Sequence, residues 1–408
     1  MSKPFLRGFK SYLKRLTLYL LRSLPISSEK VGSPKGFYKS TRDWITRYQA
    51  SNLPIFYKEI YPSHWIYRVE PKTIDKSSDW RFSVGYLGSK VETPTTFVAL
   101  IPHGRVCGSN GVVITPDDQL LADVSIEFGV MSENAKDHSI LKKFKLPKVV
   151  KTNDTVAVLS AVGSTAYFHW MFDVLPRIYL LRCSRVINQI DKFLVNEMRF
   201  KFQEETLNVL GIPKEKIIAT DESFHIKAEK LVVPSLPGIT GSMPQWACNF
   251  LREEFLRGIA TDKADRSQRI YISRAMANHR RVINEDELID FLIQLNFKIY
   301  LLESLPFMEQ VSVFYHSKFI IAPHGGGLTN LVFCPPGSKV IELFSPNYVN
   351  GCYRAISNMV DLDYWYLLGE GQPPSEHTGN HLLNTGGQDM RIDINLLAKT
   401  IELAGIEH

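Results

Sequence analysis

The sequence has little of what marks several common classes of protein. It contains five cysteines in 408 residues, dispersed and without CxxC spacing, which indicates neither a disulfide framework nor a zinc site and favours a reducing compartment. The GxxxxGK[ST] motif of a P-loop is missing, and so is the GxSxG nucleophile elbow of α/β-hydrolases. These absences argue against both classes of enzyme.

Strong charge of one sign is also missing. The net charge of +6 is mild, and part of the excess lies in the first 30 residues rather than along a nucleic-acid-binding stripe. We therefore expect anionic substrates or lipids, and no nucleic acid. With 44% hydrophobic residues, the chain has the composition of an ordinary globular protein of about two or three domains.

Residues 1–30 mix basic side chains with leucine, phenylalanine and tyrosine, and contain no apolar run long enough to span a bilayer. Such a segment predicts either a basic amphipathic helix on an anionic membrane surface or a solvated helix packed on its domain. Charges interrupt its apolar part, which disfavours a signal peptide. We expect a cytoplasmic protein, with peripheral attachment at the inner face of the membrane if the first alternative holds.

The order of predicted elements indicates an α/β protein. Residues 80–130 alternate apolar positions with turn signals and predict short antiparallel strands, whereas residues 156–234 alternate helices with strands. A second, Rossmann-like alternation covers residues 269–344. We divide the chain into a basic segment (1–35), a first domain (36–242), a connecting helix and linker (243–268), a second domain (269–345) and a completing segment (346–408).

The stretch SKFIIAPHGGGLTNLVFCPPGSKVIELF, residues 317–344, predicts strand, glycine loop, short helix, turn and strand. Glycines after His324 let backbone approach a ligand, and the amide end of a helix over 328–334 attracts anions. Glu342 is expected near the same end of a parallel sheet as the loop. The stretch predicts a phosphate cradle, with an ordinary βα turn as the alternative.

A basic loop follows the strand predicted over residues 269–273. It carries Arg274, Arg280 and Arg281, at the strand end where α/β proteins bind ligands. Guanidinium groups pair with diphosphate oxygens and keep their charge, so we expect this loop and the glycine loop to meet at one phosphate group. A solvated basic loop is the alternative.

His169 and Asp173 lie four residues apart in HWMFDVLPRIYLL and share one face of the helix predicted around residues 167–182. An aspartate that orients a histidine suits a general base accepting a proton from a hydroxyl. The alternative is a structural hydrogen bond inside an apolar helix. The further ligands that a zinc site requires are not evident.

Together, HWMFDVLPRIYLL, YISRAMANHRRVINEDEL and APHGGGLTNLVFCPPGSKVIELF resemble the DUF563, or family 61, glycosyltransferases over roughly residues 85–345. The resemblance implies a GT-B-like fold, with two Rossmann-like domains facing a central cleft. It implies inverting, metal-independent transfer from a nucleotide-sugar donor to a glycan, lipid-linked or other hydroxyl acceptor, in polysaccharide or glycoconjugate synthesis. No cofactor and no metal are expected.

The resemblance also implies roles for individual residues. Arg274, Arg280 and Arg281 resemble the arginines that bind the donor diphosphate, and Glu342 is expected to accept hydrogen bonds from the ribose. The expected donor loop reads HGGGLTN where many relatives have HGAGLTN, and comprises His324, Gly325, Gly326, Gly327, Leu328, Thr329 and Asn330. Either His169 or Asp173 is expected to deprotonate the acceptor.

Three alternatives accompany this hypothesis. Asp361-Leu-Asp363 spells the DxD of metal-using sugar transferases, but follows the predicted donor domain near its exit strand. A non-catalytic nucleotide-sugar or carbohydrate-binding scaffold of a polysaccharide assembly complex is consistent with the same fold. A nucleotide-sugar epimerase on a related double-Rossmann fold would form product without any acceptor.

Overall fold

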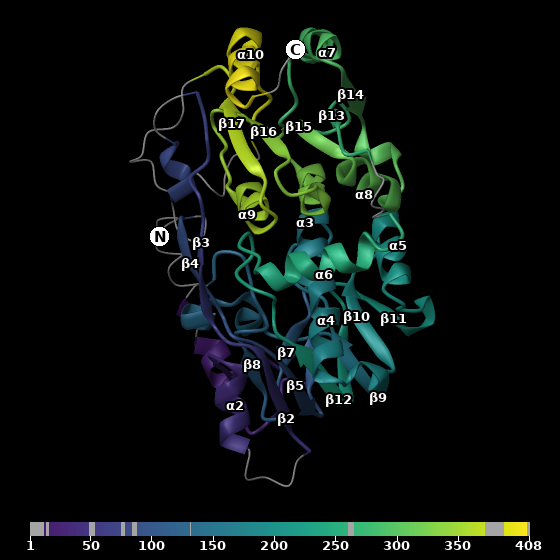
Figure 1. Cartoon of the computed structure of the whole chain (residues 1–408). Helices are drawn as coiled ribbons and strands as arrows, with labels where there is room; N and C mark the ends of the chain where they lie inside the picture. The colour runs from purple at the N-terminus through teal and green to yellow at the C-terminus, as the bar shows by residue number, and fades with distance from the viewer. Residues whose placement is uncertain are drawn as a thin grey trace, which may run out of the picture. The chain divides into compact units, whose positions relative to one another are not determined.

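The structure, a computed structural model, describes residues 12–13, 16–48, 54–74, 78–83, 88–130, 132–259, 265–371 and 387–405 (Figure 1). The chain forms two compact units. The first comprises Met1–Pro62, Thr95–Phe200 and Gly211–Pro237, and the second comprises Ser63–Pro94, Lys201–Leu210 and Gly238–His408. The chain passes for the last time from the first unit to the second after Pro237. The first domain was expected to end at residue 242.

Two segments that sequence order assigned to the first domain, Ser63–Pro94 and Lys201–Leu210, are parts of the second unit. The shorter one holds helix α5 (Lys201–Val209), whose Glu205 carboxylate accepts a hydrogen bond from the Phe307 amide at 2.8 Å. That amide begins helix α8 (Phe307–Tyr315) of the second unit. Because such contacts join residues about a hundred positions apart, local patterns carry no sign of them.

The first unit is built on a ten-stranded mixed sheet. Its antiparallel part occupies the region where turn signals predicted short strands, and its parallel part uses β9, β10, β11 and β12, which confirms the α/β class. The strands are β1 (Gly36–Tyr38), β2 (Phe56–Tyr61), β5 (Thr96–Pro102), β6 (Arg105–Cys107), β7 (Val112–Ile114), β8 (Gln119–Leu121), β9 (Val150–Val158), β10 (Lys192–Asn196), β11 (Ile217–Thr220) and β12 (His225–Pro234).

The helix predicted around residues 167–182 is present but contains a wide turn. It consists of α3 (Tyr167–His169), the π-helical turn η5 (Trp170–Val174) and α4 (Leu175–Ser184). Pro176 has no N–H for the preceding turn and its ring crowds that turn, which accounts for the widening. Such π-turns are frequent at functional sites.

The second unit contains a five-stranded, entirely parallel sheet in the order β14-β13-β15-β16-β17. Its strands are β13 (Gln268–Ile272), β14 (Phe297–Tyr300), β15 (Ser317–Pro323), β16 (Lys339–Phe344) and β17 (Asp363–Leu368). Chain order reverses between β13 and β15. In open α/β sheets, ligands bind beyond the carboxyl ends of the strands at such a switch point.

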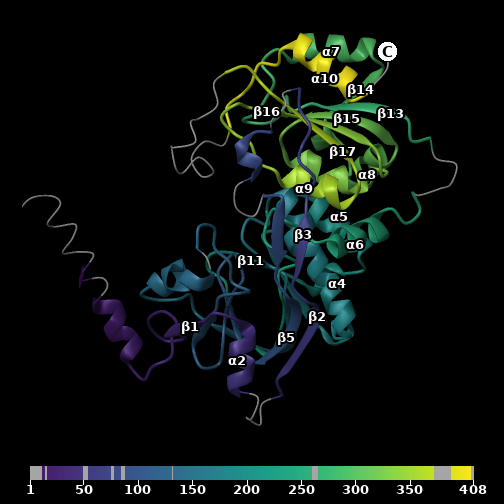
Figure 2. The ribbon, with the colours of Figure 1, turned by 60° about the vertical axis from the view of Figure 1, so that its left-hand side comes forward.

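Helices cover both faces of this second sheet (Figure 2). Helices α7 (Glu285–Gln294) and α10 (Ile394–Leu403) lie on one face, while α8 and α9 (Cys352–Met359) lie on the other. Leu292 and Leu397, from α7 and α10, share a buried cluster with Ile341 and Leu367 of the sheet. A small antiparallel pair, β3 (His64–Tyr67) and β4 (Lys90–Thr93), completes the unit. Burial on both faces is typical of parallel strands.

Helix α7 begins after Asn284, and its N-terminus lacks the side-chain-to-backbone hydrogen bonds of a capping box. The Asn284 side chain instead pairs with the backbone of Ile392, through an amide donor at 2.9 Å and an oxygen acceptor at 3.0 Å. Its amide also donates to the Glu287 carboxylate at 3.0 Å, but its oxygen accepts no hydrogen bond from a backbone N–H of the first turn. The tertiary contact satisfies two backbone groups at once, so it replaces the local cap and ties α7 to the segment before α10.

The described part of the N-terminal segment is helical over residues 12–13 and 16–23. Leu18 is buried and Arg22 donates hydrogen bonds to Ser33 and to the Leu141 carbonyl, whereas Tyr19 and Leu20 are exposed. Over the ranges given above, no helix combines the length and hydropathy needed to cross a bilayer.

Candidate active site

The arginine loop and the glycine loop meet at the switch point of the second unit. Arg274 follows β13, and Gly325 follows the neighbouring strand β15. A Cβ atom on Gly325 would collide with Nη1 of Arg274 and lie 2.6 Å from its Cζ. Glycine is required here by close approach, because its φ of 176° is ordinary extended backbone. The expected meeting of the two loops is thus present in the structure.

Arg274 and Arg280 carry buried hydrogen-bond donors that protein groups leave unused. The Nε atoms of both side chains are buried and have no hydrogen-bond partner among the described residues. Arg274 donates from Nη2 to the His279 carbonyl at 3.1 Å, and the Arg280 guanidinium lies 5.0 Å from the centre of the Tyr348 ring. Burial, and then the neighbouring charge of Arg280, lower the pKa of Arg274. Paired cations with unused donors suit the oxygens of a diphosphate.

The backbone of Arg280 adds a second unusual feature. Its φ of 58° lies in the left-handed region, which costs roughly 1–3 kcal/mol for a residue with a β-carbon. Gly387, with a φ of 76°, packs so closely that its Cβ would come within 2.6 Å of Arg280 Cγ. Backbone strain of this kind persists where the surrounding structure holds a residue in place. It is consistent with an Arg280 side chain that is positioned to contact a ligand.

Arg281 is engaged differently from its two neighbours. Its backbone N–H, Nε and Nη2 donate to the Asp389 carboxylate at 3.0, 3.0 and 2.6 Å. This pairing raises the pKa of the exposed Arg281 guanidinium. The contacts favour a role in anchoring the chain near Asp389, and donor binding by Arg281 stays a prediction.

His324 and Glu342 form a buried pair beside the glycine loop. Nδ1 of His324 and Oε1 of Glu342 share a short hydrogen bond, while the Tyr364 hydroxyl donates to Oε2 at 2.5 Å. Both carboxyl oxygens are thus engaged by protein groups, and Glu342 is fully buried. This geometry favours a positioning role for Glu342 over direct contact with a ribose, which stays a prediction. Sequence reasoning missed Tyr364, since its strand pattern signals only core.

The protonation of this pair follows from its burial. Desolvation raises the pKa of Glu342 well above its ordinary value, and desolvation together with Arg280 and Arg274 lowers that of His324 well below its own. A protonated Glu342 donates to Nδ1 of an uncharged imidazole, so the imidazole proton lies on Nε2. His324 therefore offers a neutral hydrogen-bond donor beside two cations.

The rest of the predicted donor loop is mostly interior. Leu328, Thr329 and Asn330 are buried, and the Asn330 amide donates to Gln310 at 3.0 Å. They belong to η9 (Gly326–Phe333), a 3₁₀ helix where a short helix over residues 328–334 was expected. Gly326 and Gly327 are half-buried. The three following residues therefore hold the loop in place, while Gly326 and Gly327 form its accessible part.

His169 and Asp173 form the hydrogen-bonded pair that their spacing predicts, with 2.8 Å between Nδ1 and Oδ2. Asp173 is buried, whereas the side chain of His169 is 21% exposed. The imidazole packs against Phe128 and Phe168, and a Cβ on Gly163 would lie 3.2 Å from Nε2. With Nδ1–H donating to the carboxylate, Nε2 is the nitrogen able to accept a proton.

Arg177 extends this pair and was missed by sequence reasoning. It is fully buried and donates to the carbonyls of Pro234, at 2.7 and 3.2 Å, and Ser160, at 3.2 Å. Burial lowers the pKa of Arg177 to about 9, although the charge of Asp173 opposes the shift. The one sequence signal for Arg177 is its position, four residues after Asp173, which itself lies four residues after His169.

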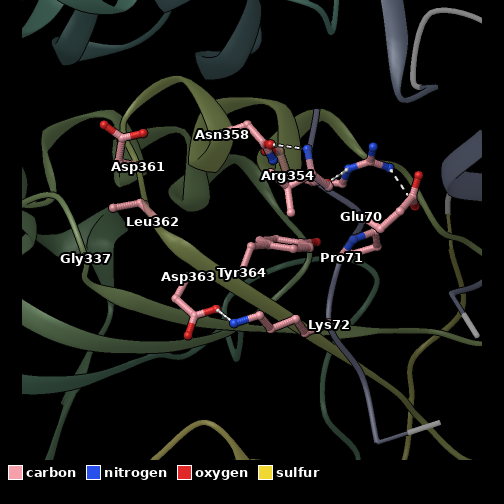
Figure 3. A pocket seen from close by; sticks show the side chains of 11 residues that line it. Glu70, Pro71, Lys72, Gly337, Arg354, Asn358, Asp361, Leu362, Asp363 and Tyr364 are labelled. Atoms are coloured by element: carbon pink, nitrogen blue, oxygen red, sulfur yellow. Dashed lines mark hydrogen bonds and ion pairs between the residues drawn. The ribbon is translucent and has the colours of Figure 1, made fainter. Parts of the chain in front are cut away.

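The aspartates of the DxD sequence lie elsewhere in the second unit. Asp361 and Asp363 line a cavity of about 330 Å³, where the Asp363 carboxylate is paired with Lys72 at 2.8 Å (Figure 3). Asp363 begins β17, whereas the glycine loop follows the end of β15 in the same parallel sheet. The two therefore lie at opposite edges of the sheet, and the DxD is remote from the arginines.

Comparison with known proteins supports the resemblance. Residues 167–341 match the family model described as Glycosyltransferase 61, and this range holds His169, Asp173, the arginine loop and the glycine loop. Glu342 follows it directly.

Among curated proteins, the chain is similar to the EGF domain-specific O-linked N-acetylglucosamine transferases of several animals. Identity is 34% over 98 residues for Drosophila melanogaster (23% of this chain, 18% of the relative). It is 31% over 101 residues for Xenopus laevis (24% and 19%) and 28% over 105 residues for Mus musculus (24% and 20%). The matched part thus spans about a fifth of the length of these relatives. The chain is thus similar to glycosyltransferase family 61 over residues 167–341, which are less than half of its length.

Proposed function

We propose that this protein is a glycosyltransferase that moves a sugar from a nucleotide-sugar donor to a hydroxyl group, with inversion and without a metal. The observation that carries the proposal is the contact of the Arg274 guanidinium with Gly325 at the switch point. The unused Nε donors of Arg274 and Arg280, within the described part of the chain, fit a leaving diphosphate. The family match supports glycosyl transfer as the reaction class.

In this proposal the fold is GT-B-like, with the second unit binding the donor and the first presenting the acceptor. Two features support that division. The arginine and glycine loops belong to the second unit, and the His169–Asp173 pair belongs to the first. A parallel α/β layer is present in both.

The proposed reaction is a direct displacement. His169 Nε2 accepts the proton of the acceptor hydroxyl, whose oxygen forms a bond to the anomeric carbon. The bond from that carbon to the diphosphate oxygen breaks on the opposite side, and the diphosphate leaves with the electron pair. Arg274, Arg280 and the loop amides stabilise its charge. We assign the base to His169, because Asp173 is buried and serves to orient Nδ1.

A screen of nucleotide sugars tests the proposal. The similar proteins are named as N-acetylglucosamine transferases, so UDP-N-acetylglucosamine is the first donor to examine, beside GDP-, CMP- and dTDP-sugars. We expect one donor class to raise the melting temperature and to yield transfer or slow hydrolysis, because binding stabilises the native state. Binding without any turnover would favour the scaffold alternative. Product formed without an acceptor and with a changed sugar would favour the epimerase.

We also propose that the N-terminal helix lies on an anionic membrane surface. Tyr19 and Leu20 expose apolar surface, while Leu18 and Arg22 hold the helix to its own unit. Residues 1–28 contain lysine and arginine but no acidic residue. Flotation with anionic liposomes tests this. We expect loss of binding after Tyr19 and Leu20 are changed to serine, whereas equal binding by the variant would contradict the proposal.

A further inference from the structure

A cavity of about 510 Å³ lies at the carboxyl edge of the parallel strands in the first unit. Its lining comes from segments that directly follow β9, β10 and β11, and from a turn that contains Ser109. Apart from Gly163, the lining residues all carry hydroxyl, amide, carboxylate or guanidinium groups. Ligand sites of this size are usually lined mainly by apolar side chains, so this cavity suits an unusually polar ligand.

The cavity adjoins the proposed base. Gly163 lines it, and a Cβ on this residue would lie 3.2 Å from Nε2 of His169 and 3.0 Å from Cδ2. The φ of Gly163 is 75°, so both its backbone conformation and the nearby imidazole favour glycine. A hydroxyl held in the cavity near Gly163 would be close to the nitrogen that accepts a proton.

Hydrogen bonds between separate segments fix the wall of the cavity. Asn196 bonds through its amide to the carbonyls of Ser109 and Ala161, at 3.0 and 2.8 Å, and accepts from the Ala161 amide at 2.9 Å. Ser164 lines the same cavity with 1% exposure, and its hydroxyl has no hydrogen-bond partner in the part of the chain that the structure describes. A buried, unpaired hydroxyl costs about 1–3 kcal/mol, which a hydroxyl-bearing ligand would recover.

Charge restricts the ligand further. Three carboxylates line the cavity, Glu197, Asp221 and Glu222, against one guanidinium, that of Arg199. Arg199 is held at 2.5 Å by Glu197, which leaves the local charge negative. A phosphate or carboxylate on the ligand would be repelled, whereas an uncharged or amine-bearing ligand would not.

We infer that this cavity is the acceptor subsite and that it selects an uncharged or amine-bearing sugar. The inference rests on the proposed glycosyl transfer and names the acceptor class for the same reaction. A sugar is favoured over a peptide because the lining side chains offer hydroxyl, amide and carboxylate partners, and none of them is aliphatic or aromatic. It disfavours an acceptor whose phosphate group must enter the cavity.

Direct binding tests this without a donor. Isothermal titration would compare 4-nitrophenyl β-glucoside, β-glucosaminide and β-glucuronide with a serine- and threonine-containing hexapeptide. We expect the first two to bind at least about tenfold tighter than the glucuronide, since like charges oppose the third. Equal or tighter glucuronide binding, tighter peptide binding, or no binding of any glycoside would overturn the inference.

Matched variants locate the binding. Ser164→Ala should weaken glucoside binding severalfold, whereas Ser160→Ala should not, because Ser160 has an equally buried, unpaired hydroxyl over the described residues but does not line the cavity. Asp221→Asn with Glu222→Gln should improve glucuronide binding, and Glu215→Gln, on the same unit but outside the cavity, should not. Equal effects of Ser164→Ala and Ser160→Ala would overturn the inference.

The two proposals fail in distinguishable ways. Nucleotide-sugar binding, measured by thermal shift, depends on residues of the second unit and should be unchanged in all of these variants. If glycoside selectivity fails while the nucleotide-sugar shift persists, only the acceptor inference is overturned. If no nucleotide sugar shifts the melting temperature, glycosyl transfer itself is contradicted.

Discussion

In the second unit, Arg274 and Gly325 come from two different strand ends and meet across a sheet, whereas in the first unit His169 and Asp173 stand one turn apart on a single helical segment. The first arrangement depends on the register of parallel strands and on close approach at one glycine. The second depends on helix spacing, and the buried Arg177 cation interacts electrostatically with its Asp173. Donor binding should therefore be sensitive to backbone packing, and proton transfer to the identity of single side chains.

The largest expected effect is on proton transfer. His169→Ala should lower turnover by about 10²- to 10⁴-fold with little change in nucleotide-sugar binding, because the base acts on the acceptor. Single-turnover rates and thermal shifts would separate the two quantities. His169→Gln serves as the control for packing. A rate within about tenfold of wild type would remove His169 from the role of base.

The donor half should respond to Arg274→Ala with a loss of about 10²- to 10³-fold in turnover, as for other preorganised charge-stabilising donors. Gly325→Ala should cause a similar loss, since its methyl group displaces the same guanidinium. The two changes together should cost little more than either alone. Arg281→Ala is the matched control from the same loop, and its loss should be much smaller, because Asp389 engages its side chain. Two outcomes would contradict this comparison. One is additive losses of turnover in the Arg274→Ala and Gly325→Ala double variant, and the other is an equal loss for Arg274→Ala and Arg281→Ala.

The Glu342 pair should give the protein a pH-dependent stability. A carboxyl whose folded-state pKa is raised stabilises the native state below its unfolded pKa of about 4.3, and this contribution is lost as pH rises towards the raised value. Glu342→Gln retains a donor for His324 but does not ionise. The melting temperature of Glu342→Gln relative to wild type should therefore rise with pH above about 4.3. A difference independent of pH between 5 and 9 would contradict the raised pKa.

The smallest expected effect concerns metals. Transfer should be unchanged in excess EDTA, and Asp361→Asn should retain turnover near that of wild type, because the DxD lies at the opposite sheet edge from Arg274. Asp363→Asn would also remove the pair with Lys72, so its stability must be measured in parallel. Loss of transfer in EDTA that Mg²⁺ or Mn²⁺ restores would contradict metal independence.

Much of the fold follows from local patterns. The strand predicted over residues 269–273 is β13, Gln268–Ile272, and the helix predicted around residues 167–182 is present as α3, η5 and α4. The class is α/β, as predicted. The capping of α7 and the π-turn before Pro176 were not predicted, because tertiary bonds to Ile392 and crowding by a proline ring overrode ordinary helix signals. The segments 63–94 and 201–210 joined the second unit through contacts distant in sequence.

For the candidate site, the sequence by itself determined which residue types stand at strand ends and on helix faces: the arginine loop, the glycine loop and the His169–Asp173 spacing. It could do so because each depends on local backbone geometry. Only the tertiary structure decided which of them meet. It brought Arg274 against Gly325, paired Arg281 with Asp389 and joined Glu342 to His324 and Tyr364. These contacts depend on strand register and burial, which join residues that local patterns cannot relate.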